Sequence, residues 1–215
     1  MKRAELTRQK ILTAAEAEFS EVGLYGARVD SIVGRAGVNK RMIYAYFGNK
    51  EQLYITVLSR VYSRLAQAEQ AWMGEEASCE ETIRRVIAMY FDFLASDPIF
   101  VRMLLWENLN GAGYIRSSEA GMRKAPSLQM LKDTVRRGIR EGVFRADVDP
   151  ENTVLSVNMC CFSYFSNIHT MSHLLQKELT APDAVRSYAA HITEMILRFI
   201  RKDAEKQAEG SIKNE

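Results

Sequence analysis

The chain is short of the features that mark secreted proteins. It has three cysteines in 215 residues, and two of them, Cys160 and Cys161, are neighbours whose side chains on a helix would point in different directions. An odd count without a framework spacing argues against a disulfide-stapled domain and favours a reducing compartment. Residues 1–10 carry charge with no apolar run behind them, so no signal peptide is expected. We therefore expect a cytoplasmic protein.

Charge is missing from one long stretch, residues 152–176, which contains no Asp, Glu, Lys or Arg. That length is enough to span a bilayer. However, the stretch is too polar for a helix that faces lipid, because it includes Asn158, Ser163, Ser166, Asn167, His169, Ser172 and His173. The sequence predicts a helix that protein buries on several faces, and no membrane partner.

Catalytic and metal-binding motifs are also missing. The chain has no glycine-rich phosphate loop, no GxSxG elbow and no convincing catalytic triad. His169 and His173 have the four-residue spacing of metal ligands, but no second carboxylate or cysteine cluster accompanies them in the sequence. We expect no enzyme, no metal and no cofactor.

The periodicity is that of helices throughout, with apolar residues recurring every three or four positions and no alternating run that suggests a sheet. The prediction is an all-α protein of about nine helices, with an N-terminal three-helix head and a C-terminal antiparallel helical bundle. We expect a DNA-binding domain over residues 1–50, a ligand-binding and dimerisation domain over residues 51–205, and a frayed tail over residues 206–215.

Local signals mark several helix ends. The first helix should run from Leu6 to Val22, with Gly23 as its left-handed cap. Side-chain caps are predicted for the helices that begin after the following residues: Asn39, Asn49, Ser78, Asp97 and Asp149. Residues 109–125 hold three glycines and predict a loop, and one helix is expected to carry the whole uncharged stretch.

Residues 29–50 predict two short helices joined by a turn at Gly37, where a positive φ costs little only for glycine. Ile43 and Phe47 should face the core, leaving the basic and aromatic residues of the second helix outside. Residues 1–50 hold nine Lys/Arg against five Asp/Glu, and the remainder holds twenty against twenty-two. A helix–turn–helix with a basic second helix on a mildly acidic body is typical of a protein that binds DNA.

About fifty N-terminal residues resemble the TetR family of transcriptional regulators. The resemblance is carried by the following positions: Thr7, Arg8, Ile11, Leu12, Ala14, Ala15, Phe19, Gly23, Val29, Ile32, Ala36, Gly37, Val38, Ile43, Tyr44, Tyr46, Phe47, Asn49, Lys50, Glu51 and Leu53. Residues 138–150 are similar to the family's link into its dimerisation helices, although this match is weaker. The resemblance implies an all-helical homodimer whose effector usually releases double-stranded DNA.

The resemblance also implies which residues contact DNA. The candidate DNA-binding residues are Arg28, Asn39, Lys40, Arg41, Tyr44, Ala45, Tyr46 and Lys50. Arg41 or Lys40 is expected to donate to guanine, while Lys50 and the tyrosine hydroxyls contact phosphates. Core packing within the head remains an alternative for Tyr44 and Tyr46. Two positions depart from the family pattern: Arg28 replaces a Thr or Ser cap, and Ala45 replaces a larger residue.

The body offers two further sets of candidates. The candidate effector-pocket residues are Tyr90, Phe93, Met103, Trp106, Met130, Phe162, Phe165 and His169, although Met and aromatic residues at helical spacing are more often plain core. The candidate dimer-interface residues, on two long helices, are Val157, Cys161, Tyr164, Ile168, Ile192, Ile196 and Phe199, with a fully intramolecular core as the alternative. Two charged residues near the pocket set, Arg102 and Glu107, are expected at the surface, with orientation of a ligand as the alternative role for either.

The leading hypothesis is a repressor that binds a palindromic operator as a homodimer and is released by a small-molecule effector. One alternative is a helical carrier or enzyme whose head is vestigial, for which removing the charges of Lys40, Arg41 and Lys50 would leave the function unchanged. Another alternative is an activator, or an architectural DNA-binding protein without a ligand.

Overall fold

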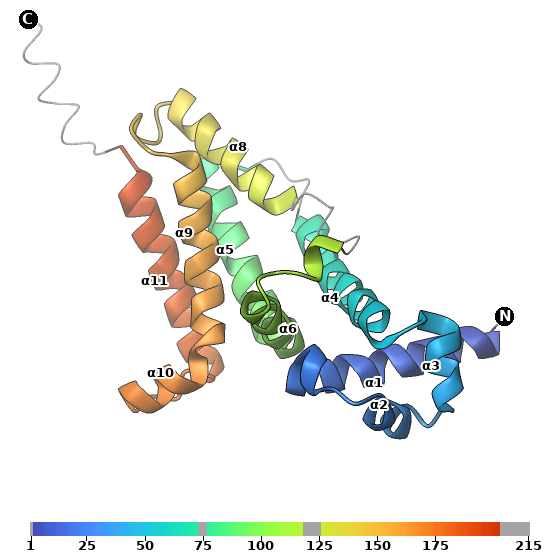
Figure 1. Ribbon diagram of the computed structural model, residues 1–215. Coiled ribbons are helices and arrows are strands. Elements are labelled where there is room, and N and C mark those ends of the chain that lie inside the picture. Colours follow the sequence, from blue (N-terminus) through green and yellow to red (C-terminus); the bar gives the residue numbers. More distant parts are fainter. Residues whose placement is uncertain (1, 73–76, 118–125, 203–215) are drawn as a thin grey trace, which may run out of the picture. The chain divides into compact units, whose positions relative to one another are not determined.

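The computed structural model describes residues 2–72, 77–117 and 126–202 (Figure 1). Within these ranges there are ten α-helices, one 3₁₀ helix and no β-strand. The all-α prediction is confirmed, with one helix more than expected. The predicted tail and the end of the predicted loop lie outside the described residues. The chain forms two compact units, Met1–Ala68 with Ser96–Lys124 and Glu69–Ala95 with Ala125–Glu215. The division predicted at residue 50 stays a prediction.

The first unit contains the N-terminal helices and two later elements. They are α1 (Lys2–Gly26), α2 (Val29–Ala36), α3 (Lys40–Phe47), most of α4 (Lys50–Trp72), α6 (Pro98–Leu109) and the 3₁₀ helix η1 (Ile115–Ser117). α1 packs against both α2 and α6. The core of this unit is formed by fully buried apolar side chains, among them Ile11, Phe19, Ile32, Ile43, Leu53 and Tyr54. The apolar stripes of the sequence therefore face inward as their spacing predicts.

Side-chain caps fix the short helices of this unit. Asn39 Oδ1 accepts from the Arg41 amide at 2.9 Å, and Asn49 Oδ1 accepts from the Gln52 amide at 2.8 Å. Asp97 Oδ1 accepts from the Phe100 amide at 3.0 Å at the start of α6. Each cap satisfies a helical N–H group that has no partner within its own helix, so the sequence determines where α3, α4 and α6 begin. These predicted caps are confirmed.

Gly23 interrupts α1 at a kink but does not form the predicted left-handed cap. Its backbone has φ 67° and ψ 179°, which is not helical and lies outside the left-handed helical region, and a second helical segment continues from it to Gly26. A Cβ atom on Gly23 would lie 2.7 Å from Cδ2 of Trp106, whose indole nitrogen donates to the Ser20 carbonyl at 3.3 Å. The glycine is therefore needed because the Trp106 ring of α6 lies against the α1 backbone at its kink.

The second unit is a helical bundle. It contains α5 (Cys79–Ser96) up to Ala95, α8 (Pro126–Arg140), α9 (Pro150–Ser166), α10 (Ile168–Leu175) and α11 (Pro182–Ile200). α9 packs against α8, α10 and α11 (Figure 1). The core includes Ile83, Phe91, Leu131, Val157, Leu197 and Ile200. The predicted caps at Ser78 and Asp149 are confirmed by hydrogen bonds to the amides of Glu81, Glu151 and Asn152.

The uncharged stretch forms two helices instead of one. The Asn167 side-chain amide donates to the Ser163 carbonyl at 3.0 Å and to Ser166 Oγ at 3.0 Å. Asparagine side chains compete in this way with helical backbone hydrogen bonds. The break at Asn167 separates α9 from α10 and accounts for the additional helix. Among the described residues, no helix is long and apolar enough to cross a membrane.

The link between α8 and α9 depends on Gly138. A Cβ atom there would lie 2.1 Å from the Phe144 ring, and the Gly138 carbonyl accepts from the amides of Val143 and Phe144 at 2.9 and 3.0 Å. The Arg145 amide then donates to the Ile200 carbonyl at 2.9 Å, which joins the link to the end of α11. The link after Gly138 thus joins the end of α8, the start of α9 and the end of α11.

Candidate DNA-binding interface

The α3 surface has an apolar side and a polar side. Ile43 and Phe47 are buried, whereas Arg41 and Ala45 lie on the opposite side of the helix and are exposed. The Arg41 side chain makes no hydrogen bond or ion pair with any other described residue, and only its backbone amide is bonded, to Asn39. Its guanidinium is therefore available to a base edge, and Ala45 beside it leaves room for close approach.

Both tyrosines of α3 lie toward solvent. Tyr44 is 46% exposed and Tyr46 is 36% exposed. The Tyr46 ring also lies against Phe47, with 6.3 Å between the ring centroids. Tyr44 is therefore not a core residue, and both hydroxyls are accessible to phosphate oxygens. Their contact with DNA remains a prediction.

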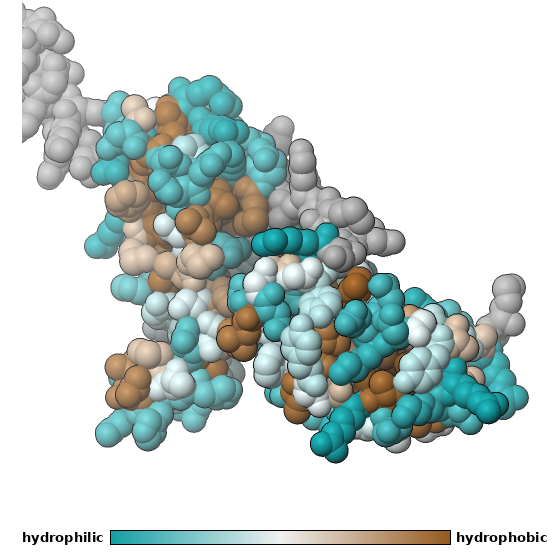
Figure 2. All heavy atoms as spheres, viewed as in Figure 1, coloured by the Kyte–Doolittle hydropathy of each residue, from teal (hydrophilic) through white to brown (hydrophobic). Residues whose placement is uncertain are grey.

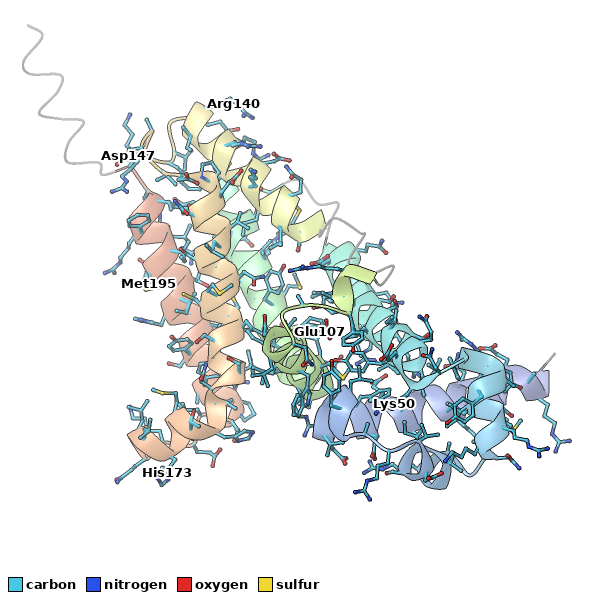
Figure 3. The ribbon with its side chains drawn as sticks, in the orientation of Figure 1. Lys50, Glu107, Arg140, Asp147, His173 and Met195 are labelled. Carbon is cyan, nitrogen blue, oxygen red and sulfur yellow. The ribbon has the colours of Figure 1, made fainter. Side chains whose placement is uncertain are left out.

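The two lysines of the candidate interface already have partners. Lys40 Nζ forms an ion pair with Asp30 Oδ1 of α2 at 2.7 Å. Lys50 Nζ donates to the Ala27 carbonyl at 3.1 Å, and Figure 3 shows Lys50 among the helices of the head. A lysine ammonium has three donors, so Lys50 can fix the α1–α2 connection and still donate to a phosphate.

The N-terminus of α2 is capped from another helix. Arg28 makes no side-chain cap, as expected for arginine. Instead, the buried Glu18 carboxylate of α1 accepts from the Arg28 amide at 3.3 Å and from the Ser31 hydroxyl. Arg35 lies 3.4 Å from the same carboxylate. Glu18 was not among the predicted site residues, although its position three residues after Ala15 places it on the buried side of α1.

The expectation that Glu107 lies at the surface is wrong, while Arg102 is exposed as expected. The Glu107 side chain, labelled in Figure 3, is 0% exposed. Its Oε1 accepts from the Tyr54 hydroxyl at 3.0 Å, and its Oε2 accepts from the amides of Tyr114 and Ile115 at 3.2 and 2.8 Å. Glu107 can be buried because three donors satisfy its carboxylate. It holds the chain after α6 against α4.

The candidate pocket residues divide between the two units. Met103 and Trp106 belong to the first unit, and the other candidates belong to the second. Tyr90, Phe93 and Met103 are buried, and His169 is exposed. Half-buried positions are occupied by Trp106, Met130, Phe162 and Phe165. The rings of Phe165 and Phe91 lie 5.6 Å apart. Their contact with an effector remains a prediction.

A buried polar cluster surrounds Tyr90. The Tyr90 hydroxyl lies 2.7 Å from Ser127 Oγ and 3.4 Å from Glu69 Oε1, and Ser127 also donates to Glu69. Glu69 is only 3% exposed, and none of the described ion pairs neutralises its charge. Burial raises the pKa of the Glu69 carboxyl above its ordinary value. Tyr90 was among the predicted pocket residues, whereas the Glu69 carboxylate beside it was not.

Most of the candidate dimer-interface side chains are buried within one chain. This holds for Val157, Cys161, Ile168, Ile192 and Ile196. The exposed apolar residues of α9 and α11 are a different set: Leu155, Met159, Tyr188, Met195 and Phe199. Figure 2 shows hydrophobic surface over α9, α10 and α11. Only Phe199 belongs to both sets, and Tyr164 is half-buried against Tyr188 with ring centroids 4.7 Å apart.

The cysteines are not in a reactive environment. Burial raises the pKa of Cys161 to about 12 and raises the pKa values of Cys79 and Cys160. Arg137 donates to the Cys79 sulfur at 3.2 Å, but burial outweighs its effect on the thiol. All three are protonated near neutral pH, and a thiol reacts mainly as its thiolate. The described residues also contain no group of three or more potential metal ligands.

The geometry thus defines a class of protein, a helix–turn–helix DNA-binding regulator with a helical body. Two family models match the chain: "Bacterial regulatory proteins, tetR family" over residues 11–57 and "Tetracyclin repressor-like, C-terminal domain" over residues 80–196. The second match alone covers more than half of the chain. The protein belongs to the TetR family of transcriptional regulators.

Relatives and solved structures agree with this assignment. The chain is 34% identical over 202 residues to NicS, a transcriptional repressor of Pseudomonas putida, and the match covers 93% of this chain and 95% of NicS. The ketosteroid regulator KstR2 of Mycobacterium tuberculosis has a similar fold, with a TM-score of 0.71 and 21% identity over 91% of this chain and 95% of KstR2. FadR from Bacillus subtilis, solved with stearoyl-CoA, has a TM-score of 0.63 and 19% identity over 90% of this chain and all of FadR.

Proposed function

We propose that this protein is a transcriptional repressor that binds a palindromic DNA site as a homodimer and is released by a small-molecule effector. The observation that carries the proposal is the α3 surface, where Arg41 is exposed and unpaired among the described residues between exposed tyrosines. The similarity to the repressor NicS along nearly the whole chain supports the same function.

DNA recognition can be tested by selecting sites from a pool of random duplexes. We expect the wild type to enrich a palindrome with half-sites about one helical turn, or a multiple of it, apart. Arg41→Ala should weaken binding to the selected site by at least about 30-fold, because it removes one bidentate base contact of about 1–3 kcal/mol from each of the two half-sites. Arg186→Ala, on the exposed side of α11, is the control with the same loss of charge. Absence of any enriched site at low salt would refute the proposal.

The dimer is proposed to form through the exposed apolar surface of α9 and α11. Leu155 and Phe199 are 54% and 61% exposed, and Met195 (Figure 3) lies on the same side of α11 as Phe199, one turn before it. A second copy would remove this surface from water, which is favourable at roughly 25 cal/mol per Å² of apolar area. The same surface on both copies would give a two-fold dimer.

The oligomeric state can be measured by light scattering after size exclusion. The wild type should have the mass of two chains, and Leu155→Asp or Met195→Asp should give one chain. Leu109→Asp is the matched control, because Leu109 is also highly exposed but belongs to the first unit. A wild-type monomer, or a dimer that persists in both aspartate variants, would contradict the proposed interface.

The effector is proposed to bind in the body, where the cluster of Glu69, Tyr90 and Ser127 supplies the polar groups. A buried carboxylate without a cation is costly, and such groups occur often at functional sites. Release of the selected DNA by fractionated cell extract would identify the effector, and Tyr90→Phe should change the concentration that is needed. Extract that never releases the DNA would exclude an effector among the metabolites present.

A further inference from the structure

The ion pair between Asp30 and Lys40 connects the two helices of the helix–turn–helix. Among the described ion pairs, it is the only one that involves a residue of α3. The nitrogen and oxygen atoms are 2.7 Å apart, and both side chains reach solvent. The hydrogen bond from Lys40 to Asp30 raises the pKa of the lysine. The pair therefore lies on the surface that the proposed function directs toward DNA.

Lys40 is poorly placed within its own helix. It is the first residue of α3, where the positive end of the helix dipole disfavours a cation. An anion beside Lys40 relieves this repulsion, and the Asp30 carboxylate supplies it in the free protein. A DNA phosphate is the other anion that fits the same position, because helix N-termini and ammonium groups both bind phosphate. Asp30 and phosphate thus compete for one ammonium.

Position on the helix separates Lys40 from Arg41. Arg41 lies on the side of α3 opposite the core, whereas Lys40 lies on the flank next to α2 and its Asp30. Arg41 therefore has no competing anion among the described residues, and Lys40 does. Arg41, the proposed base-reading residue, remains free, whereas Asp30 neutralises the charge with which Lys40 would attract phosphates.

We propose that Asp30 restrains sequence-independent DNA binding by withholding Lys40 from the phosphate backbone. This inference rests on the proposed DNA-binding function and assigns a role to an acidic residue outside the predicted DNA contacts. Freeing Lys40 should add one phosphate contact per head. Each phosphate contact makes the fall of log affinity with log salt concentration steeper by about 0.9, so the two heads of a dimer make it steeper by roughly 1.8.

The test uses the full chain and a fluorescein-labelled duplex of 30 base pairs and mixed sequence, with anisotropy measured between 50 and 200 mM salt. Asp30→Asn should bind this duplex more tightly than the wild type. The ratio of its affinity to that of the wild type should fall about tenfold across that salt range, as the steeper salt dependence requires. The double variant Asp30→Asn/Lys40→Met should return to the wild-type slope, because one neutral pair replaces another.

Glu5→Gln is the matched control. It removes the same charge from the first unit. Among the described residues, the Glu5 side chain accepts a hydrogen bond from the Gln9 side chain, and a glutamine at position 5 can accept the same bond. An equal increase in affinity for the duplex in Glu5→Gln would overturn the proposal, because the effect of Asp30→Asn would then be one of net charge. A double variant whose salt dependence is shallower than that of the wild type by about 1.8 would also overturn the proposal, because Lys40 would then already contact phosphate in the wild type. A wild type without salt-dependent binding would instead refute the DNA-binding function itself.

Discussion

Gly23 gives the most demanding test of how α1 and α6 are packed. In Gly23→Ala, the new methyl group would lie 2.7 Å from Cδ2 and 2.8 Å from Cε3 of the Trp106 ring. The ring is rigid, and its indole nitrogen is hydrogen-bonded to Ser20, so it cannot turn aside freely. The backbone must also keep φ 67° and ψ 179°, a conformation that residues other than glycine avoid.

The expected cost has two parts. The backbone conformation costs about 1–3 kcal/mol for a residue other than glycine. Forcing a methyl group against a packed ring costs about 1–3 kcal/mol more. The free energy of unfolding should therefore fall by about 4 kcal/mol, which is a large fraction of the 5–15 kcal/mol that is typical of folded proteins.

Urea denaturation followed by far-ultraviolet circular dichroism measures this loss without relying on Trp106 as the probe. Gly34→Ala is the control, because Gly34 is an exposed residue within α2 and its Cβ would meet nothing within 4 Å. That substitution should stabilise the protein by about 0.5–1 kcal/mol. The two changes are chemically identical and should have opposite signs.

A Gly23→Ala variant as stable as the wild type would refute the close packing of Trp106 on α1. Adding Trp106→Leu to Gly23→Ala separates the two costs, because a smaller side chain relieves the steric overlap and leaves the backbone strain. The double variant should then lose less than the sum of the two single variants.

Three further predictions concern buried or bonded polar groups. Glu107→Ala should lower the free energy of unfolding by about 3 kcal/mol, because the Tyr54 hydroxyl and two backbone amides lose their acceptor; Glu107→Gln, which keeps an acceptor oxygen, should lose less in the same urea titration. Burial raises the pKa of Glu69, so the folded state keeps a proton that the unfolded state releases near pH 4.5, and the free energy of unfolding should fall as the pH rises above that value. Glu69→Gln should abolish this fall in thermal melts from pH 4 to 8. A parallel pH dependence in the two proteins would contradict the prediction. Lys50→Met should lower the free energy of unfolding by about 1 kcal/mol, because the hydrogen bond to Ala27 is lost. It should also make the salt dependence of DNA binding shallower by about 0.9 per head, and an unchanged salt dependence would show that Lys50 has only a structural role.

Local chemistry made part of this structure predictable. The caps at Asn39, Asn49 and Asp97 depend on residues only two or three positions away, so the sequence alone determines them. The inward direction of Ile43 and Phe47 follows from helical spacing for the same reason. Because Ile43 and Phe47 occupy the buried side of this short helix, its other residues face solvent, so the exposed surface of α3 was predictable as well.

The parts that were missed depend on contacts between distant segments. Glu107 appeared to be a surface residue because its partners, Tyr54 and the amides after α6, are brought to it only by the fold. The same holds for Glu18, which accepts from the amide of Arg28, ten residues later, at the start of α2. On α9, two apolar rows share the same periodicity, and the sequence does not show that Val157 faces the core while Leu155 faces solvent.

The most direct test of the central claim, that α3 reads base edges in the major groove, is methylation protection on a duplex selected by the wild-type protein. We predict that the protein protects N7 of a guanine in each half-site, and that Arg41→Ala removes this protection while Arg186→Ala retains it. Protection that is absent, or that is unchanged in Arg41→Ala, would contradict the account.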